Sequence, residues 1–170
     1  MNIRVGILTI SDRSSSGTRD DLSGPALQQL IESQGWLISN YAIIPDEKQA
    51  IQEKLIEWSD LHQLDIILTT GGTGFGPRDI TPEATSSILD RPTPGLAEAM
   101  RNASLKITPH AMLSRATAGI RKQTLIVNLP GSPKGALENL EVILPVLPHA
   151  VQLLTNDPGA EAGHQAQKLN

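Results

Sequence analysis

The chain has 170 residues, enough for one domain with an ordinary hydrophobic core. Hydrophobic residues make up 39% and aromatic residues only 2%, so we expect a core of aliphatic side chains. The formal net charge is -4 and no block of basic residues occurs, which argues against a nucleic-acid partner. No cysteine is present, which excludes disulfides, thiolate zinc sites and cysteine nucleophiles and fits a reducing compartment.

The N-terminal apolar run is short and ends in charged residues, so it predicts a strand and no signal peptide. No apolar run approaches the roughly 18 residues that a membrane span needs. From these two features we expect a cytoplasmic protein that does not associate with membranes.

The first half of the chain alternates apolar runs with helical patterns. Runs rich in β-branched residues predict strands buried on both faces, and apolar residues at helical spacing predict helices. The expected order is a strand over 3–10, a loop over 11–22, a helix over 25–34 with Ser23 as its N-cap and Gly35 as its end, a strand over 36–44, a helix opened by Pro45 and Asp46, and a strand over 65–70.

The second half contains two Thr-Pro pairs, and proline in the first turn is typical of helix starts. The expected elements are a helix from Thr81, a helix from Thr93 to about Lys106, a strand, turn and strand over 115–128, and helical segments over 135–154 split by Pro145 and Pro148. The polar residues that follow lack periodicity. We therefore expect one domain over 1–155 and a mobile tail over 156–170.

Alternating strands and helices predict an α/β fold with a mostly parallel sheet and helices on both faces. In such sheets ligands bind outside the carboxyl ends of the strands. Four expected loops lie at that edge: 11–22, 45–47, 71–80 and 129–135.

The stretch TTGGTGFGPRDITPEAT, residues 69–85, holds four glycines within six positions. A Walker A loop would need lysine and serine or threonine where Pro77 and Arg78 stand, and Pro77 also occupies the third glycine position of the dinucleotide fingerprint. Glycines after a buried strand still let backbone N–H groups approach an anion, so the loop predicts an anion site, with a tight structural turn as the alternative. Phe75 either covers a ligand or plugs the end of the core.

Two aspartates flank this expected anion site. Asp46 alone is explained as an N-cap of the following helix, and Asp79 alone as the closing residue of an Asx-turn. Together they lie at one edge of the sheet, where a divalent cation between them and bound phosphates makes electrostatic sense. Magnesium is held in this way, through one or two carboxylates and phosphate oxygens. Arg78 is then a candidate for neutralising phosphate charge, or else a solvated loop arginine.

The second half adds further candidates. Ser114 precedes a strand, and Asn128 ends one, just before Pro130, Gly131 and Ser132. A rigid turn followed by a helix start offers backbone N–H donors to an anion, although an ordinary strand-to-helix connection has the same sequence.

These motifs together resemble the molybdopterin adenylyltransferases of molybdenum cofactor biosynthesis, a domain that also forms part of gephyrin. The resemblance covers about residues 3–155 and rests on ILTISDR (7–13), DLSGPAL (21–27), IPDE (44–47), the 69–85 stretch, PGLAEAMR (94–101), SLKITPHAMLSRATAGIR (104–121) and NLPGSPKG (128–135).

The resemblance implies a three-layer, Rossmann-like α/β/α sandwich that is usually a homotrimer. It implies an ATP- and Mg²⁺-dependent nucleotidyltransferase that moves AMP from ATP to the phosphate of molybdopterin and releases diphosphate, with a molybdenum insertase as a candidate partner. The family's two essential aspartates fall on Asp46 and Asp79. Residues linked to the substrates fall on Ser114, Asn128, Pro130, Ser11, Asp12, Gly71, Gly72, Thr73 and Gly74.

Two other readings stay open. The domain is a molybdopterin-binding or scaffold module without turnover, or it is a nucleotide-dependent oxidoreductase. The intact aspartate pair favours catalysis over the first reading, and the failed dinucleotide fingerprint argues against the second.

Overall fold

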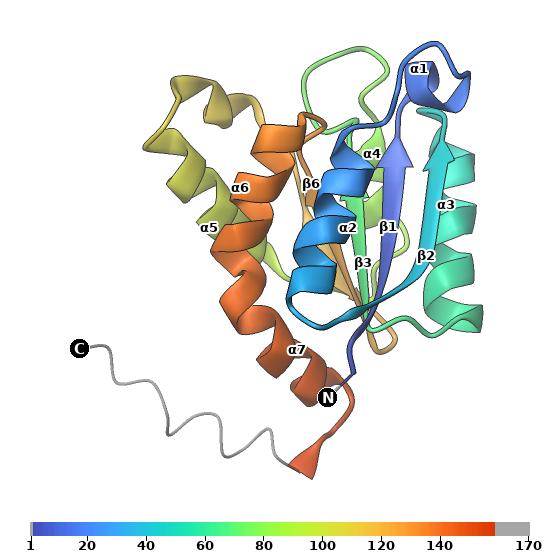
Figure 1. Cartoon of the computed structure of the whole chain (residues 1–170), viewed down its shortest axis with the longest axis vertical. Helices are drawn as coiled ribbons and strands as arrows, with labels where there is room; N and C mark the ends of the chain where they lie inside the picture. Colours follow the sequence, from blue (N-terminus) through green and yellow to red (C-terminus); the bar gives the residue numbers. More distant parts are fainter. Residues whose placement is uncertain (1, 159–170) are drawn as a thin grey trace.

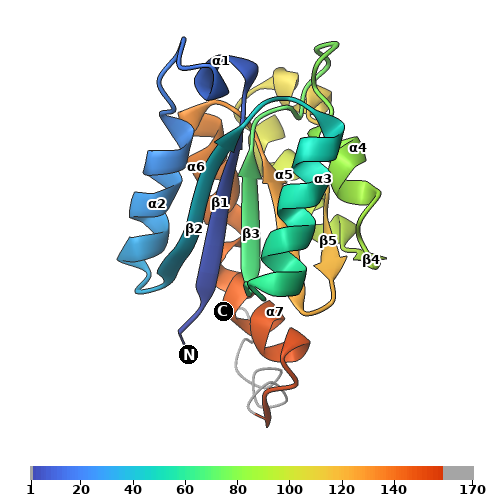
Figure 2. The same cartoon turned by 90° about the vertical axis from the view of Figure 1, so that its right-hand side faces the viewer.

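A computed structural model describes residues 2–158 of the chain. Over these residues one six-stranded sheet lies between two layers of helices (Figure 1 and Figure 2). The strands are β1 (Arg4–Ile10), β2 (Leu37–Ile44), β3 (Ile66–Thr70), β4 (Arg91–Pro92), β5 (Ala118–Arg121) and β6 (Thr124–Leu129). They are ordered β2-β1-β3-β6-β5-β4.

The first four strands in this order are parallel, whereas β5 and β4 run antiparallel to their neighbours. The sheet is therefore mostly parallel, and the predicted three-layer α/β/α class is confirmed. The short edge strand β4 is an element that the sequence did not predict.

The helices are α1 (Asp12–Ser15), α2 (Ser23–Ser33), α3 (Lys48–Ile56), α4 (Thr81–Ser86), α5 (Pro94–Leu105), α6 (Pro133–Ile143) and α7 (Leu147–Leu154). A π-helical turn, Glu57–Leu61, extends α3, and a 3-10 turn, Pro109–Leu113, follows α5. The 3-10 turn Leu144–Val146 separates α6 from α7, so the predicted break near Pro145 and Pro148 is confirmed.

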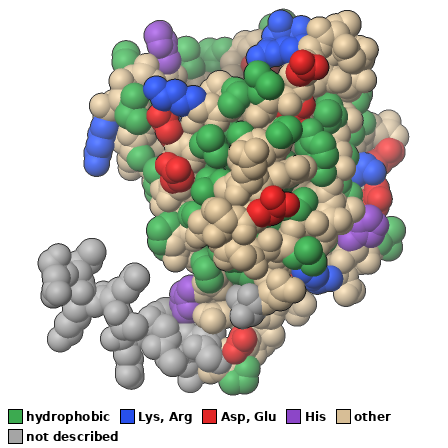
Figure 3. Space-filling view, in the orientation of Figure 1, with side chains coloured by type: hydrophobic (Ala, Val, Ile, Leu, Met, Phe, Trp, Pro, Cys, Tyr) green, Lys and Arg blue, Asp and Glu red, His purple; other side chains and the backbone are tan. Residues whose placement is uncertain are grey.

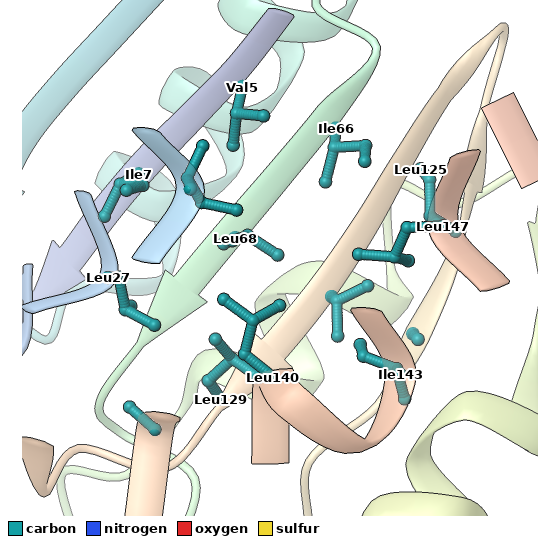
Figure 4. Packing of buried hydrophobic residues seen from close by; sticks show 14 of the residues in the cluster. Val5, Ile7, Leu27, Ile66, Leu68, Leu125, Leu129, Leu140, Ile143 and Leu147 are labelled. Carbon is teal, nitrogen blue, oxygen red and sulfur yellow. The ribbon is translucent and has the colours of Figure 1, made fainter. Parts of the chain in front are cut away.

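Two aliphatic clusters fill the spaces on the two sides of the sheet. Val5 and Ile7 of β1 face the cluster under α2, α5, α6 and α7, which Figure 4 shows from close by. Leu8 and Ile10 face the cluster under α3 and α4. Because side chains alternate along a strand, β1 supplies both clusters, which explains its nearly continuous apolar sequence.

Three local expectations are corrected. The loop over 11–22 contains the short helix α1. Ser23 is the first residue of α2 and not its N-cap, because the carboxylate of Asp21 accepts from the N–H groups of Ser23 and Gly24 at 3.1 and 3.0 Å. Phe75 is 68% exposed, so it does not plug the core.

The remaining predicted helices and strands are found near their expected positions. Of the tail expected to be mobile, residues 159–170 lie outside the described residues. Within residues 2–158, no helix is both long and apolar enough to cross a membrane.

Candidate functional site

Two clefts open near the carboxyl ends of the parallel strands. The first has a volume of about 480 Å³ and is lined by residues from all four loops expected at this edge. The second, of about 310 Å³, lies between the loop over 71–80 (the glycine loop), α5, the 3-10 turn 109–113 and the start of α6. Ser132 lines both clefts, so the turn over 130–132 separates them.

The predicted site residues divide between these clefts. The first cleft takes Ser11, Asp12, Asp46, Gly71, Gly72, Asp79, Gly131 and Ser132. The second takes Thr73, Gly74, Ser114, Pro130 and Ser132. Arg78 and Asn128 line neither of them.

Asp46 is held by a residue from another loop. Its Oδ2 accepts a hydrogen bond from the backbone N–H of Asp12 at 2.8 Å, and its own N–H donates to Asp12 Oδ1 at 3.0 Å. Helix α3 begins at Lys48 and has no side-chain cap. The N-cap explanation of Asp46 is therefore wrong, and its carboxylate is positioned by β1 and α1.

The pKa of Asp46 is raised above its ordinary value. Partial burial is the main cause, and the negative charges of Asp12 and Asp79 raise the pKa further. The hydrogen bond from the Asp12 N–H and the positive charge of Arg78 lower it, but by less. A carboxylate in such surroundings gains from any cation that approaches it.

Asp79 closes the glycine loop upon itself. Its Oδ2 accepts from the N–H of Gly76 at 2.8 Å, while its own N–H donates to the carbonyl of Gly76 at 3.0 Å. The bond runs backward along the chain, so it is not the Asx-turn considered from the sequence. A Cβ on Gly74 would stand 2.9 Å from the same carboxylate oxygen. Glycine at position 74 is therefore needed to make room for the carboxylate of Asp79, and not only for a bound anion.

Gly71 has a more local requirement. Its φ is +105°, and a Cβ there would collide with the carbonyl oxygen of Ile10 in the neighbouring strand β1. Only glycine fits this turn, through which β3 passes into the first cleft.

Arg78 joins three of the loops around the first cleft, its own, that of Asp12 and that of Glu47. Its guanidinium donates to both oxygens of Asp12, at 3.0 and 3.1 Å, and to Glu47 at 2.7 Å. The bonds from Arg78 to Asp12, with the N–H of Asp46, lower the pKa of the Asp12 carboxyl. Basic and acidic side chains also lie together at the upper edge of the face shown in Figure 3. Arg78 is thus not simply a solvated loop arginine, because two carboxylates already hold it.

Asp21 also lines the first cleft and was not predicted as a site residue. Its carboxylate accepts hydrogen bonds from the hydroxyls of Thr9 and Tyr41, in addition to those from the N–H groups at the start of α2. Burial raises the pKa of Asp21, but these hydrogen bonds outweigh burial and the pKa is lowered. Its position two residues before a Ser-Gly pair at a helix start is the capping signal that the sequence offered.

The second cleft combines apolar and polar side chains. Ile107, Ala111 and Leu113 supply apolar surface, and Ser114 and Thr73 supply hydroxyls. Five further polar residues of this lining were missed from the sequence: Arg101, Ser104, Thr108, Glu138 and Asn139. His110 lines this cleft too.

Asn128 is completely buried. Its amide nitrogen donates to the hydroxyls of Thr69 and Thr85 at 2.9 and 3.0 Å, and its oxygen accepts from the N–H of Thr117 at 3.4 Å. These contacts join β6 to β3, to α4 and to the segment before β5. Its predicted contact with substrate stays a prediction.

In the described part of the chain, no three His, Cys, Asp or Glu side chains gather in a group that could hold a metal ion. Asp46 and Asp79 are the two acidic residues predicted to share a cation, and the charge of Asp79 acts on Asp46. Two carboxylates fit an ion whose remaining ligands come from phosphates and water, which is the usual arrangement for Mg²⁺.

Comparison with known proteins identifies relatives over nearly the whole chain. The family described as "Probable molybdopterin binding domain" matches residues 6–149. Gephyrin of Dictyostelium discoideum is 49% identical over 164 residues, which are 91% of this chain and 23% of gephyrin. This chain thus spans about a quarter of that relative.

Shorter relatives match along most of their length. A molybdopterin adenylyltransferase of Helicobacter pylori (strain J99) is 46% identical over 156 residues, 89% of this chain and 88% of the relative. The crystal structure of the molybdopterin biosynthesis enzyme MoaB from Thermus thermophilus superposes with a TM-score of 0.87 at 52% identity, covering 92% of this chain and 98% of that one.

Proposed function

Because this chain belongs to the family of probable molybdopterin-binding domains, we propose that it is a molybdopterin adenylyltransferase of molybdenum cofactor biosynthesis. The observation that carries the proposal is the placement of Asp46 and Asp79 in one cleft, with a second cleft directly across the 130–132 turn. Two adjacent clefts suit a reaction that joins two substrates at their phosphates. The names of relatives that match over nearly their full length support the same reaction.

We assign ATP to the first cleft. Its lining includes the two aspartates, the turn at Gly71 and the start of α6 at Ser132 and Pro133. Backbone N–H groups at glycine turns and helix starts suit phosphate oxygens. We assign the pterin to the second cleft, where apolar side chains lie beside the hydroxyl of Ser114 and the amide of Asn139. A flat heterocycle with a polar edge needs such a mixture.

Asp46 and Asp79 would hold Mg²⁺, which when bound neutralises phosphate charge in the transition state. Their carboxylates lie in the cleft assigned to ATP, and burial, together with the negative charges of Asp12 and Asp79, raises the pKa of Asp46. We infer that Arg78 stays bound to Asp12 and Glu47 and fixes the loops around this cleft.

In the reaction, the terminal phosphate oxygen of molybdopterin attacks the α-phosphorus of ATP. A new P–O bond forms there, the bond to the β-phosphate breaks, and diphosphate leaves. The chain's residues contribute position and electrostatic stabilisation, because phosphoryl transfer needs little covalent assistance from the protein.

The test is incubation of the whole chain with ATP labelled at the α-phosphate, Mg²⁺ and molybdopterin. Label on the pterin supports the transferase. Tight binding of the pterin without transfer of label would instead assign a molybdopterin-binding or scaffold module, in line with the family description as a probable molybdopterin-binding domain.

We further propose a homotrimer in the cytoplasm that passes its product to a molybdenum insertase. Apolar side chains stay exposed at the end of α5 and in the 3-10 turn that follows, as expected for a surface that another copy covers. They are Leu105, Ile107, Met112 and Leu113, with exposed fractions of 41%, 63%, 66% and 46%. Light scattering tests this proposal, which predicts a mass of three chains.

A further inference from the structure

Arg115 directly follows Ser114, which lines the second cleft, and makes several hydrogen bonds to the glycine loop. Its backbone N–H donates to the carbonyl of Thr73 at 2.9 Å. Its guanidinium donates to the carbonyl of Gly74 through Nε, and to the carbonyl of Asp79 through a terminal nitrogen, both at 2.7 Å. The other terminal nitrogen pairs with the carboxylate of Glu83 in α4.

These bonds reach both ends of one loop. Gly74 and Asp79 are five residues apart, and residues 75–78 between them are exposed. A single guanidinium therefore fixes the distance between the two ends while the tip extends into solvent. The carboxylate of Asp79 belongs to the residue whose carbonyl is held, so the direction in which that carboxylate points depends on Arg115.

Arg115 is also joined to the second cleft. Its neighbour Ser114 lines that cleft, as do Thr73 and Gly74, whose carbonyls Arg115 contacts. A ligand in the second cleft thus touches the same backbone that Arg115 fastens to Asp79.

We propose that Arg115 is a positioning residue that sets the placement of Asp79 in the first cleft. The expected effect on the rate rests on the proposed function, whereas the expected effect on the order of the loop rests on the hydrogen bonds alone. Arginine is needed because its planar fork directs donors to three separate acceptors at once. Lysine keeps the charge, but it offers one nitrogen and cannot bridge two carbonyls and a carboxylate that lie in different directions.

The test compares Arg115→Lys with Arg121→Lys. Arg121 is a matched control, because it also bonds a carboxylate and a carbonyl, those of Asp60 and Ile88. For Arg115→Lys we expect kcat to fall about 10- to 100-fold, the range typical of residues that orient metal-binding groups. The Mg²⁺ concentration for half-maximal rate should rise, and added Mg²⁺ should recover part of the rate. Arg121→Lys should leave the Mg²⁺ dependence unchanged whatever it does to the melting temperature.

Hydrogen exchange supplies a readout that needs no turnover. In Arg115→Lys the amides of Gly76 and Asp79 should exchange at least about 10-fold faster, while those of β3 keep their protection. Wild-type exchange in this loop together with wild-type Mg²⁺ dependence would overturn the proposal. If the wild-type chain itself transfers no label, the proposed function fails, and the exchange comparison still decides whether Arg115 orders the loop.

A second variant covers the case in which Arg115→Lys does not fold. Glu83→Gln removes the charge of one anchor and leaves the guanidinium in place. It should change exchange and Mg²⁺ dependence in the same direction by a smaller factor, and a Glu83→Gln chain identical to wild type in both would contradict the proposal.

Discussion

Asp12 and Asp46 hold each other reciprocally, each carboxylate accepting a hydrogen bond from the backbone N–H of the other residue, at 3.0 and 2.8 Å. The pair joins the ends of β1 and β2 across 34 positions of sequence. The second oxygen of Asp46 faces Gly72, since a Cβ on that glycine would stand 3.0 Å from it. The backbone N–H of Asp12 thus fixes one oxygen of Asp46, and the other oxygen points toward Gly72 in the lining of the first cleft.

The first prediction concerns Asp46→Asn. The amide oxygen of asparagine still accepts from the N–H of Asp12, so the loops should keep their places. Loss of the charge should lower kcat about 10²–10³-fold, as for removal of one electrostatic contact in the transition state. Pterin affinity should change little, and the melting temperature should not fall, because repulsion from Asp12 and Asp79 is relieved. Calorimetry and the labelled-ATP assay measure these effects.

Glu141→Gln, an exposed neutralisation on α6, is the control for the change in net charge. Equal losses of pterin affinity and turnover in Asp46→Asn would contradict the role proposed for Asp46, which is to act on the phosphates in the first cleft.

The second prediction concerns pH. The pKa of Asp46 is raised in the folded chain, so the stability that this group contributes at low pH is lost as pH rises through that pKa. As pH falls through the same pKa, protonation removes a negative charge that would hold Mg²⁺. Mg²⁺ affinity should therefore decline at a higher pH than an ordinary aspartate would give. Asp79→Asn removes one repelling charge and should lower the pKa of Asp46. Carbon-13 NMR of the Asp46 carboxyl follows this, and an unmoved titration would refute the electrostatic account.

The third prediction concerns Tyr41, the only tyrosine of the chain. Burial and the hydrogen bond to the Asp21 carboxylate raise the pKa of its phenol. An unfolded tyrosine ionises near pH 10, so the stability from this group is present below that pH and is lost as pH rises above it. Phenolate absorbance should stay absent from the folded chain above pH 10 and appear only with alkaline unfolding.

In Asp21→Asn the phenol should ionise nearer its ordinary pKa, because the charge that opposes phenolate is gone. Phenolate forming near pH 10 in the folded wild-type chain would show that the contact between Tyr41 and Asp21 is absent in solution.

The fourth prediction compares two glycine substitutions. Gly71→Ala places a methyl group against the Ile10 carbonyl at a positive φ, so it should destabilise by more than about 1 kcal/mol and disturb ATP binding. Gly95→Ala lies in α5 with open space around the new methyl group, so it should be neutral or stabilise by up to about 1 kcal/mol. Urea unfolding measures both, and equal effects would show that the turn at Gly71 adapts to a side chain.

The fifth prediction separates two roles of Asn128. Asn128→Ala leaves two buried hydroxyls and one N–H without their partner, which should cost about 2–4 kcal/mol. Asn40→Ala, at a half-buried position of the edge strand β2 where the amide meets the exposed ring of His62, is the control and should change stability by about 1 kcal/mol or less. An Asn128→Ala chain with wild-type stability but weakened substrate binding would restore the contact role inferred from resemblance.

The sequence predicts the strands well because β1, β3 and β6 are buried on both faces, and such strands carry a continuous apolar signal. The capping explanations of Asp46 and Ser23 are wrong for two different reasons. The partner of Asp46 lies 34 residues away, beyond the reach of a local signal, whereas the start of α2 is capped by Asp21, two residues upstream of the residue expected.

The second cleft could not be assembled from the sequence. Ser104 and Asn139 lie on α5 and α6, and only the packing of these two helices brings them together, with the amide of Asn139 donating to Ser104 at 3.2 Å. Arg115 likewise reads as an ordinary residue before a strand, since its role depends on carbonyls of a loop some 40 positions earlier.

The charge of the first cleft has a kinetic consequence. Five aspartates line it, Asp12, Asp20, Asp21, Asp46 and Asp79, against two arginines, Arg13 and Arg19. Arg78 supplies a third positive charge nearby, but it is already bound to Asp12 and Glu47. If ATP binds in this cleft as proposed, such a surface would repel the free nucleotide, a tetra-anion, and would favour its complex with a divalent cation. We therefore expect the true substrate to be the metal–nucleotide complex, so that excess uncomplexed ATP slows the enzyme only weakly as a competitor.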